Sequence, residues 1–269
     1  LAQAISLVVL ISYLYAKKNP LCLHGAELKL LKIDWSIVST LIGKGVPMAL
    51  QMMVISLSML LMITLVNRFG IHTAAAYGAA LQLWNYIQMP SYAIGMAVSS
   101  MAAQNIGAQK WDRISSITRM GIIYQLMLTG TMVLIVDVFC RSALSIWLMP
   151  GSVAMDIGVH LNYIVTWSFV FFGISMVMFG VVRANGAVVA PLIVLAISLL
   201  GIRFPLALGF LDRLHADAIW WSFPISSFVA ILMAIGYYKW GKWRTFRMMS
   251  PQAAAAQAAA AAAASAEVG

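Results

Sequence analysis

The sequence is short of charged residues and of cysteine, and each shortage excludes a class of protein. Only 9% of the 269 residues are Asp, Glu, Lys or Arg, whereas 62% are hydrophobic. About a quarter of the residues in a soluble globular domain are charged, so this composition excludes a soluble domain. The two cysteines, Cys22 and Cys140, lie far apart in the sequence. A metal site or a disulfide framework needs more ligands or closer spacing, so we expect two isolated thiols.

No constellation of catalytic residues is visible either. The sequence contains no Gly-rich phosphate loop, no Cys/His cluster and no Ser, His and Asp at a recognisable spacing. The four histidines, His24, His72, His160 and His215, are scattered along the chain. We therefore expect neither an enzyme nor a resident metal or cofactor. No nucleotide-binding module fits into the loops, so transport by this chain would have to be driven by an ion gradient or by the substrate's own gradient.

Apolar segments make up most of the chain. A bilayer core is about 30 Å thick and needs roughly 20 apolar residues per helix. Charged residues, Gly and Pro divide the chain into seven apolar segments, at about Leu1–Ala16, Ile37–Phe69, Ala74–Ala103, Ile114–Phe139, Ile157–Val182, Ala187–Leu211 and Ala218–Tyr238. This pattern predicts an all-α polytopic membrane protein embedded in a lipid bilayer.

The same pattern predicts the domain organisation. Leu1 lies inside an apolar run, so we expect residues 1–16 to be a partial transmembrane helix and the chain to be a fragment of a longer protein. Residues 17–35 are predicted to be a cytoplasmic linker, and residues 36–247 to be a lobe of six transmembrane helices. Residues 248–269, rich in alanine, are predicted to be a low-complexity cytoplasmic tail.

The Lys and Arg residues predict the orientation in the membrane. With the C-terminus in the cytoplasm, Arg68, Arg141 and Arg213 face outward and Arg203 lies within a segment, which leaves 13 of the 17 basic residues facing inward. Such an excess on one side is the positive-inside pattern. It accounts for the formal net charge of +9 without a nucleic-acid partner.

Uncharged polar residues within the segments are candidate ligand-binding groups. Gln82, Asn85 and Tyr86 are spaced i, i+3 and i+4, so they share one face of a helix. Buried amides must be hydrogen-bonded or hydrated. Each of these side chains therefore either ties helices together or lines a hydrated cavity, and we interpret their shared face as a cavity wall.

Two charged residues are expected within segments. Asp137 lies near the predicted outer end of its segment. Ionisable groups at membrane depth are costly and usually functional, so Asp137 is a candidate for ion coupling, with an interfacial anchor as the alternative. Arg203 is the cation expected at depth, facing the bundle and paired with carbonyl groups, water or an acid of another helix.

A stripe of small residues precedes a polar break. Gly95, Ser99, Ala103 and Gly107 recur every four residues, which places small side chains on one helix face. Such a face allows a neighbouring helix to approach closely.

The end of this stripe carries a family resemblance. AAQNIGAQKWDR resembles the Q-N-(I/L)-G-A-x-x-x-x-R signature of the multidrug and toxic compound extrusion (MATE) family, through Gln104, Asn105, Gly107 and Arg113. Other motifs agree in order and spacing. GKGVPMALQ resembles the start of the family's helix seven. GVVRANGAVVAP, with Arg183, resembles the link between helices ten and eleven, and RFPL, from Arg203, resembles the R-x-P-L of helix eleven.

This resemblance implies the C-terminal six-helix lobe of a bacterial two-lobe antiporter, with Leu1–Ala16 as the end of helix six and the N-terminal lobe missing. It further implies that proton or sodium influx drives export of amphipathic organic compounds by alternating access across the bacterial cytoplasmic (inner) membrane. On this interpretation, the hypothesis for the substrate cavity comprises six residues: Gln51, Gln82, Tyr86, Met89, Trp167 and Phe171.

The chain departs from the family pattern at two positions. Several branches carry Glu eight residues after the proline of helix seven, where this chain has Ile55. The G-D-T often found after helix ten is replaced by Gly186, Ala187 and Val188. This lobe therefore lacks an obvious buried carboxylate for coupling. Two alternatives stay open: a flippase for a lipid-linked glycan from the wider superfamily, and a non-transporting half-protein or membrane scaffold.

Overall fold

The computed structural model describes residues 2–17 and 35–246. It separates into two compact units, residues 1–39 and residues 40–269. The first unit contains α1 (Ala2–Ala16), a short apolar helix. The linker predicted at 17–35, apart from its ends, and the tail predicted at 248–269 lie outside the described residues, as do Cys22 and His24.

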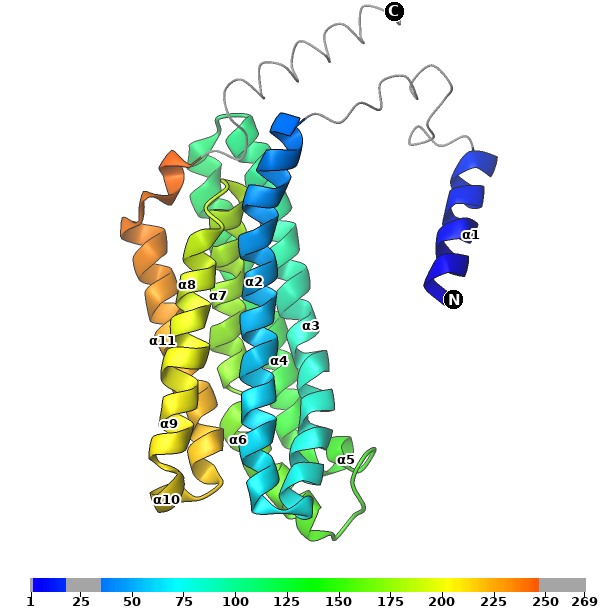
Figure 1. Cartoon of the computed structure of the whole chain (residues 1–269), viewed down its shortest axis with the longest axis vertical. Coiled ribbons are helices and arrows are strands. Elements are labelled where there is room, and N and C mark those ends of the chain that lie inside the picture. Colours follow the sequence, from blue (N-terminus) through cyan, green and yellow to red (C-terminus); the bar gives the residue numbers. More distant parts are fainter. Residues whose placement is uncertain (1, 18–34, 247–269) are drawn as a thin grey trace, which may run out of the picture. The chain divides into compact units, whose positions relative to one another are not determined.

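The second unit is a bundle of helices, and no strand occurs among the residues that the structure describes. Its main helices, the first of which begins five residues before the unit, lie side by side (Figure 1). They are α2 (Trp35–Val66), α3 (Ile71–Gly107), α4 (Trp111–Val138), α6 (Val153–Val165), α7 (Ser168–Ala184), α8 (Val189–Ala196) and α11 (Asp217–Trp240). Shorter elements connect them: η2 (Asn67–Phe69), α5 (Cys140–Leu144), η3 (Ile197–Arg203), α9 (Phe204–Gly209), α10 (Leu211–Leu214) and η4 (Lys242–Thr245). The predicted all-α fold class is confirmed.

Four of the described helices are long and apolar enough to cross a membrane. They correspond to α2 with η2, α4, α8 to α9, and α11, and the bent pair of α6 and α7 makes a fifth if it is one span. The helix α3 has 37 residues but is not among them. Amides and hydroxyls along its length, among them Gln82, Asn85 and Gln104, reduce its apolar character. This less apolar helix is packed between α4, α6 and α7.

The fifth predicted segment is not a continuous helix. It consists of α6 and α7, which meet at an angle of 43°. Thr166, at the junction, donates its hydroxyl hydrogen bond to the carbonyl oxygen of Asn162 and to a carboxylate oxygen of Asp137, each at 2.9 Å. A threonine hydroxyl that bonds the backbone four residues earlier bends a helix. The break is absent from the prediction because no Gly or Pro marks it.

The sixth predicted segment is continuous but contains a π-helix, η3. Pro205 lies two residues after the end of η3, and proline has no N–H to donate to the carbonyl group four residues earlier, that of Gly201 within η3. This favours the wider π winding at η3. As a result Arg203, the last residue of η3, is turned into the bundle and is buried.

Small residues bring α3 and α7 into backbone contact. A side chain added at Gly95 would lie 3.3 Å from the carbonyl oxygen of Met176, and one added at Gly180 would lie 2.5 Å from that of Gly95. Ser99 also lies against Gly180. The predicted close approach therefore holds for the first half of the stripe. Ala103 and Gly107 are exposed, because α7 ends one turn beyond its contact with Ser99.

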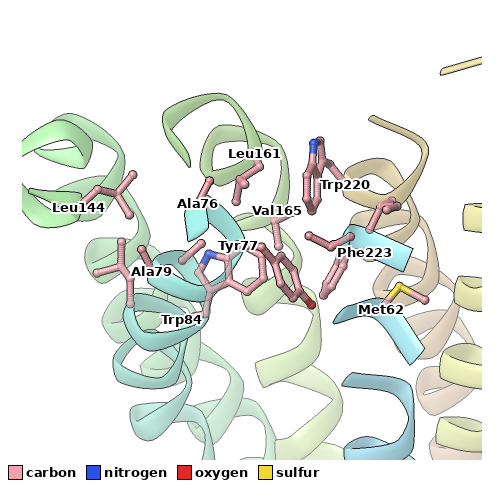
Figure 2. Close-up of a cluster of buried hydrophobic side chains, with 14 of the residues drawn as sticks. Met62, Ala76, Tyr77, Ala79, Trp84, Leu144, Leu161, Val165, Trp220 and Phe223 are labelled. Carbon is pink, nitrogen blue, oxygen red and sulfur yellow. The ribbon is translucent and has the colours of Figure 1, made fainter. Parts of the chain in front are cut away.

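An aromatic cluster forms the core at the other end of the bundle (Figure 2). Trp84 of α3 has its ring centre 5.7 Å from that of Tyr77, 5.6 Å from Phe169 and 5.5 Å from Phe223. Its indole N–H donates to Oδ1 of Asn162 at 2.9 Å. The cluster thus fixes α3 against α6, α7 and α11.

The polar break after the stripe ends α3 at Gly107, as the motif predicts. The amide of Ala108 donates to the carbonyl oxygen of Gln104 at 3.0 Å, and that of Lys110 donates to Asn105 at 2.8 Å. Gln109 has a φ of +58°, the left-handed conformation that closes many helix ends. Arg113 is exposed in the first turn of α4. These residues therefore terminate one helix and start the next.

Candidate functional site

One face of α3 is polar and exposed. Gln82, Asn85, Tyr86 and Met89 are all exposed and lie near the middle of the helix. The helix α3 packs against α4 and α7, which belong to the candidate membrane spans. Its 37 residues extend about 55 Å, beyond a bilayer core of about 30 Å, so we expect the middle of α3 to lie at membrane depth. Amide groups there are not left against hydrocarbon, since each would lose its hydrogen bonds. The face therefore requires water or another protein surface.

A cavity of about 320 Å³ opens between α2, α3 and α7, and we name it the Gln51 cavity. It is lined by Met48, Gln51, Met52, Ile55, Tyr92, Gly95, Met96, Ser99, Met176 and Arg183. Its volume is within the range of small-molecule sites. Four of the lining residues are methionines, whose flexible side chains adapt to varied apolar ligands.

Polar groups in the Gln51 cavity are available to a ligand. Gln51 is 1% exposed, and its Oε1 has no hydrogen-bond partner. Arg183 donates from Nε to the carbonyl oxygen of Phe179 at 3.2 Å and also lines the cavity. A buried amide oxygen without a partner is costly, so a hydrogen-bond donor from water or a ligand would stabilise this site.

The exposed face of α3 runs into this cavity. Met96 lines the Gln51 cavity and is 72% exposed. It follows Met89 by seven residues, which is two helical turns, so both lie on the same face. The structure thus connects Gln51 with the face that bears Gln82, Tyr86 and Met89.

A second cavity of about 40 Å³ lies next to the first, and we name it the Arg203 cavity. Its polar lining residues are Tyr77, Gln88, Ser168, Arg203 and Ser227, and the rest are Ile55, Met59, Leu81, Trp84, Phe169, Phe172, Leu199 and Phe223. Ile55 lines both cavities. The volume is sufficient for a few water molecules.

Two of the six predicted cavity residues lie elsewhere. Trp167 is half exposed at the junction of α6 and α7. Phe171 packs edge-on against Phe228 of α11, with ring centres 5.7 Å apart. Neither side chain lines the Gln51 cavity or the Arg203 cavity, and of the other four only Gln51 lines one of them. Gln82, Tyr86 and Met89 lie on the exposed face of α3 outside both cavities.

A buried hydrogen-bond network joins α3 and α4 and was not predicted from the sequence. Gln125 of α4 donates from Nε2 to the hydroxyls of Ser91 and Thr129, each at 2.6 Å. The two hydroxyl oxygens are 3.3 Å apart. The amide of Gln125 lies directly against Gly173 of α7. Gly173 has no side chain, and this leaves room for the amide of Gln125. A glycine in one apolar segment and a glutamine in another are the sequence features that could have indicated the network.

Asp137 contacts the junction of α6 and α7. Besides accepting from Thr166, it accepts the hydroxyl hydrogen bond of Tyr163 at its backbone oxygen, at 3.1 Å. No group of three or more His, Cys, Asp or Glu side chains gathers among the described residues. Cys140 is buried in α5 after Asp137, and burial raises the pKa of its thiol to about 11.

Comparison with known proteins gives consistent matches. The MatE family model matches residues 47–208. The probable multidrug resistance protein YoeA of Bacillus subtilis is 32% identical over 246 residues, which are 90% of this chain and 53% of that protein. The probable multidrug resistance protein YpnP of the same organism is 30% identical over 217 residues, 80% of this chain and 48% of that protein. The chain thus spans about half the length of these curated relatives.

Solved structures show the same fold. A crystal structure of MATE in the bent conformation has a TM-score of 0.76 at 15% identity and covers 90% of this chain and 52% of its own. An outward-facing multidrug resistance MATE family transporter has a TM-score of 0.66 at 17% identity and covers 79% of this chain and 47% of its own. Again, about half of each structure is matched.

Proposed function

The chain belongs to the MatE family of integral membrane proteins, and we propose that it forms the C-terminal six-helix lobe of a multidrug efflux transporter. The family model matches well over half of the chain, and the curated relatives are named as multidrug resistance proteins. The motifs at Gln51, Gly107, Arg183 and Arg203, in this order, support the assignment to the second half of a two-lobe protein.

The observation that carries this proposal is the exposed polar face of α3. Gln82 and Tyr86 are exposed, and none of the described residues covers them. In the proposed transporter an N-terminal lobe faces them across a water-filled cavity. The amide and hydroxyl groups bind polar parts of an amphipathic organic substrate there, and Met89 and Met96 contact its apolar parts.

Alanine at both Gln82 and Tyr86 tests this cavity in the longer transporter that carries this lobe. We expect the double variant to accumulate a fluorescent cationic drug in cells about 5-fold or more above the parent, because two hydrogen bonds and an aromatic contact are lost. Tyr124→Ala, at an exposed tyrosine of α4, serves as the matched control and should export normally. Efflux by the double variant equal to that of the parent would contradict the proposal.

We further propose that export is coupled to proton or sodium influx, with Asp137 as the coupling group. Its carboxylate holds the hydroxyl of Thr166 at the junction of α6 and α7, so a change in its charge acts on a bend between two helices. Alternating access then changes this bend during each cycle. Basic residues at the ends of α3 and α11, among them Lys110 and Lys242, support a cytoplasmic C-terminus in the inner membrane.

Asp137→Asn separates charge from hydrogen bonding, because an amide oxygen still accepts from Thr166 but cannot ionise. We expect efflux driven by a pH or sodium gradient to fall at least about 10-fold, because removal of an essential ionisable group lowers rates by that much or more. The amount of folded protein should be unchanged. Asp156→Asn, which removes an exposed ion pair with Arg141, is the control. Full efflux by Asp137→Asn at every pH and sodium concentration would exclude Asp137 as the coupling group.

A further inference from the structure

We propose that the Arg203 cavity binds a small inorganic anion of the size of a halide. Arg203 is 8% exposed and lies within a membrane-crossing segment. Its Nε donates to Oγ of Ser226 at 2.9 Å, and its guanidinium carbon is 4.3 Å from the ring centre of Phe223. A guanidinium carries five N–H donors. Within the described residues Ser226 is its hydrogen-bond acceptor, so donors are left for a ligand.

No carboxylate in the described part of the chain neutralises this charge. Asp156 pairs with Arg141 and Asp217 with His160, each at 2.9 Å, and Asp137 accepts from Thr166. Asp112 and Asp212 are exposed at helix starts away from the cavity. Buried charges are paired in stable proteins, because an unpaired one costs several kcal/mol. A bound anion would supply the counter-charge of Arg203.

The polar groups around the cavity suit an anion rather than a cation. The hydroxyl of Tyr77 is fully buried, has no hydrogen-bond partner and belongs to the cavity lining. Figure 2 shows this side chain beside Phe223, the ring on which Arg203 rests. The hydroxyls of Ser168 and Ser227 line the same space. Hydroxyl and guanidinium groups donate hydrogen bonds to an anion, and the aromatic walls exclude competing water.

The size of the cavity selects the class of anion. About 40 Å³ holds one monatomic ion with one or two waters, since a water needs about 10–15 Å³. A phosphate ester or an organic carboxylate does not fit. Ile55, where several branches of the family carry Glu, lines this cavity. Because Ile55 carries no negative charge, the charge of Arg203 leaves this cavity positive.

Chloride titration of the purified chain in detergent tests the site. Sodium gluconate replaces sodium chloride at constant ionic strength, and thermal unfolding is recorded. A ligand that binds only the folded state stabilises it saturably, so we expect Tm to rise by about 5 °C over 0.5 M chloride. Iodide should quench tryptophan fluorescence saturably, because Trp84 lines the cavity. Arg203→Met should abolish both responses, and Arg183→Met, at the other cavity, should preserve them.

The absence of a chloride response in the wild type, or the same response in Arg203→Met, would overturn the proposal. Arg203→Lys keeps the charge but has fewer N–H donors. The chloride concentration that gives half of the rise in Tm should therefore be about 10-fold higher than for the wild type. If Arg203→Met does not fold, anomalous diffraction from bromide-soaked crystals of the wild type tests the site instead. An anomalous peak within hydrogen-bond distance of the guanidinium supports the site, and a cavity that holds water alone refutes it.

Discussion

Gly173→Ala is expected to lower the free energy of unfolding by about 2–4 kcal/mol. In most helices this substitution stabilises, because glycine costs about 0.5–1 kcal/mol relative to alanine. At this position the added carbon would overlap the side-chain amide of Gln125 and lie 2.8 Å from Oγ of Ser91. Gln125 cannot turn away without breaking both of its hydrogen bonds, which would leave Ser91 and Thr129 buried with fewer partners.

The control for this prediction is Gly130→Ala in α4. An added side chain at Gly130 meets nothing within 4 Å, so this variant should be as stable as the wild type or slightly more stable. Thermal unfolding of both variants in the same detergent measures the difference. Equal melting temperatures for Gly173→Ala and Gly130→Ala would show that the network of Gln125 does not constrain α7.

Trp84→Ala should also be severe and should lower the free energy of unfolding by about 3–5 kcal/mol. Trp84 is 1% exposed and contacts three aromatic rings from α3, α7 and α11. Its removal leaves a large cavity and also deprives Oδ1 of Asn162 of its donor. Chemical or thermal unfolding in detergent provides the measurement.

Two further variants separate packing from hydrogen bonding at Trp84. Trp84→Phe retains much of the ring contact but lacks the N–H. Its free energy of unfolding should therefore lie between those of the wild type and Trp84→Ala. Trp221→Ala, at a half-exposed tryptophan of α11, should cost little. A loss at Trp84→Ala no larger than at Trp221→Ala would mean that the aromatic cluster does not hold these helices together.

The sequence is sufficient for features that depend on local spacing. The charge shortage and the apolar segments predict the membrane class and the helices. The spacing of Gln82, Tyr86 and Met89 places them on one face, and the structure has that face exposed. The polar break formed by Gln104, Asn105 and Gly107 predicts the end of α3. Each of these depends on residues within a few turns of one another, so periodicity and helix-ending residues carry the information.

Contacts between distant segments are not encoded in local spacing. The bend at Thr166 depends on Asp137, 29 residues earlier, and the partner of Arg203 is Ser226, 23 residues later. Trp167 and Phe171 lie in a segment that is apolar on all sides, so its pattern does not say which face meets a neighbour. For this reason their positions relative to the cavities emerge only from the packed structure.

The contact between α3 and α7 also determines how stiffness is distributed through the lobe. Where Gly95 meets Gly180, backbone presses on backbone, and close-packed interiors are nearly incompressible. We therefore expect α3 and α7 to move together as one rigid unit. By contrast α2 packs only loosely against the other described helices. When the lobe changes conformation, we therefore expect α2 to shift more readily than the pair of α3 and α7.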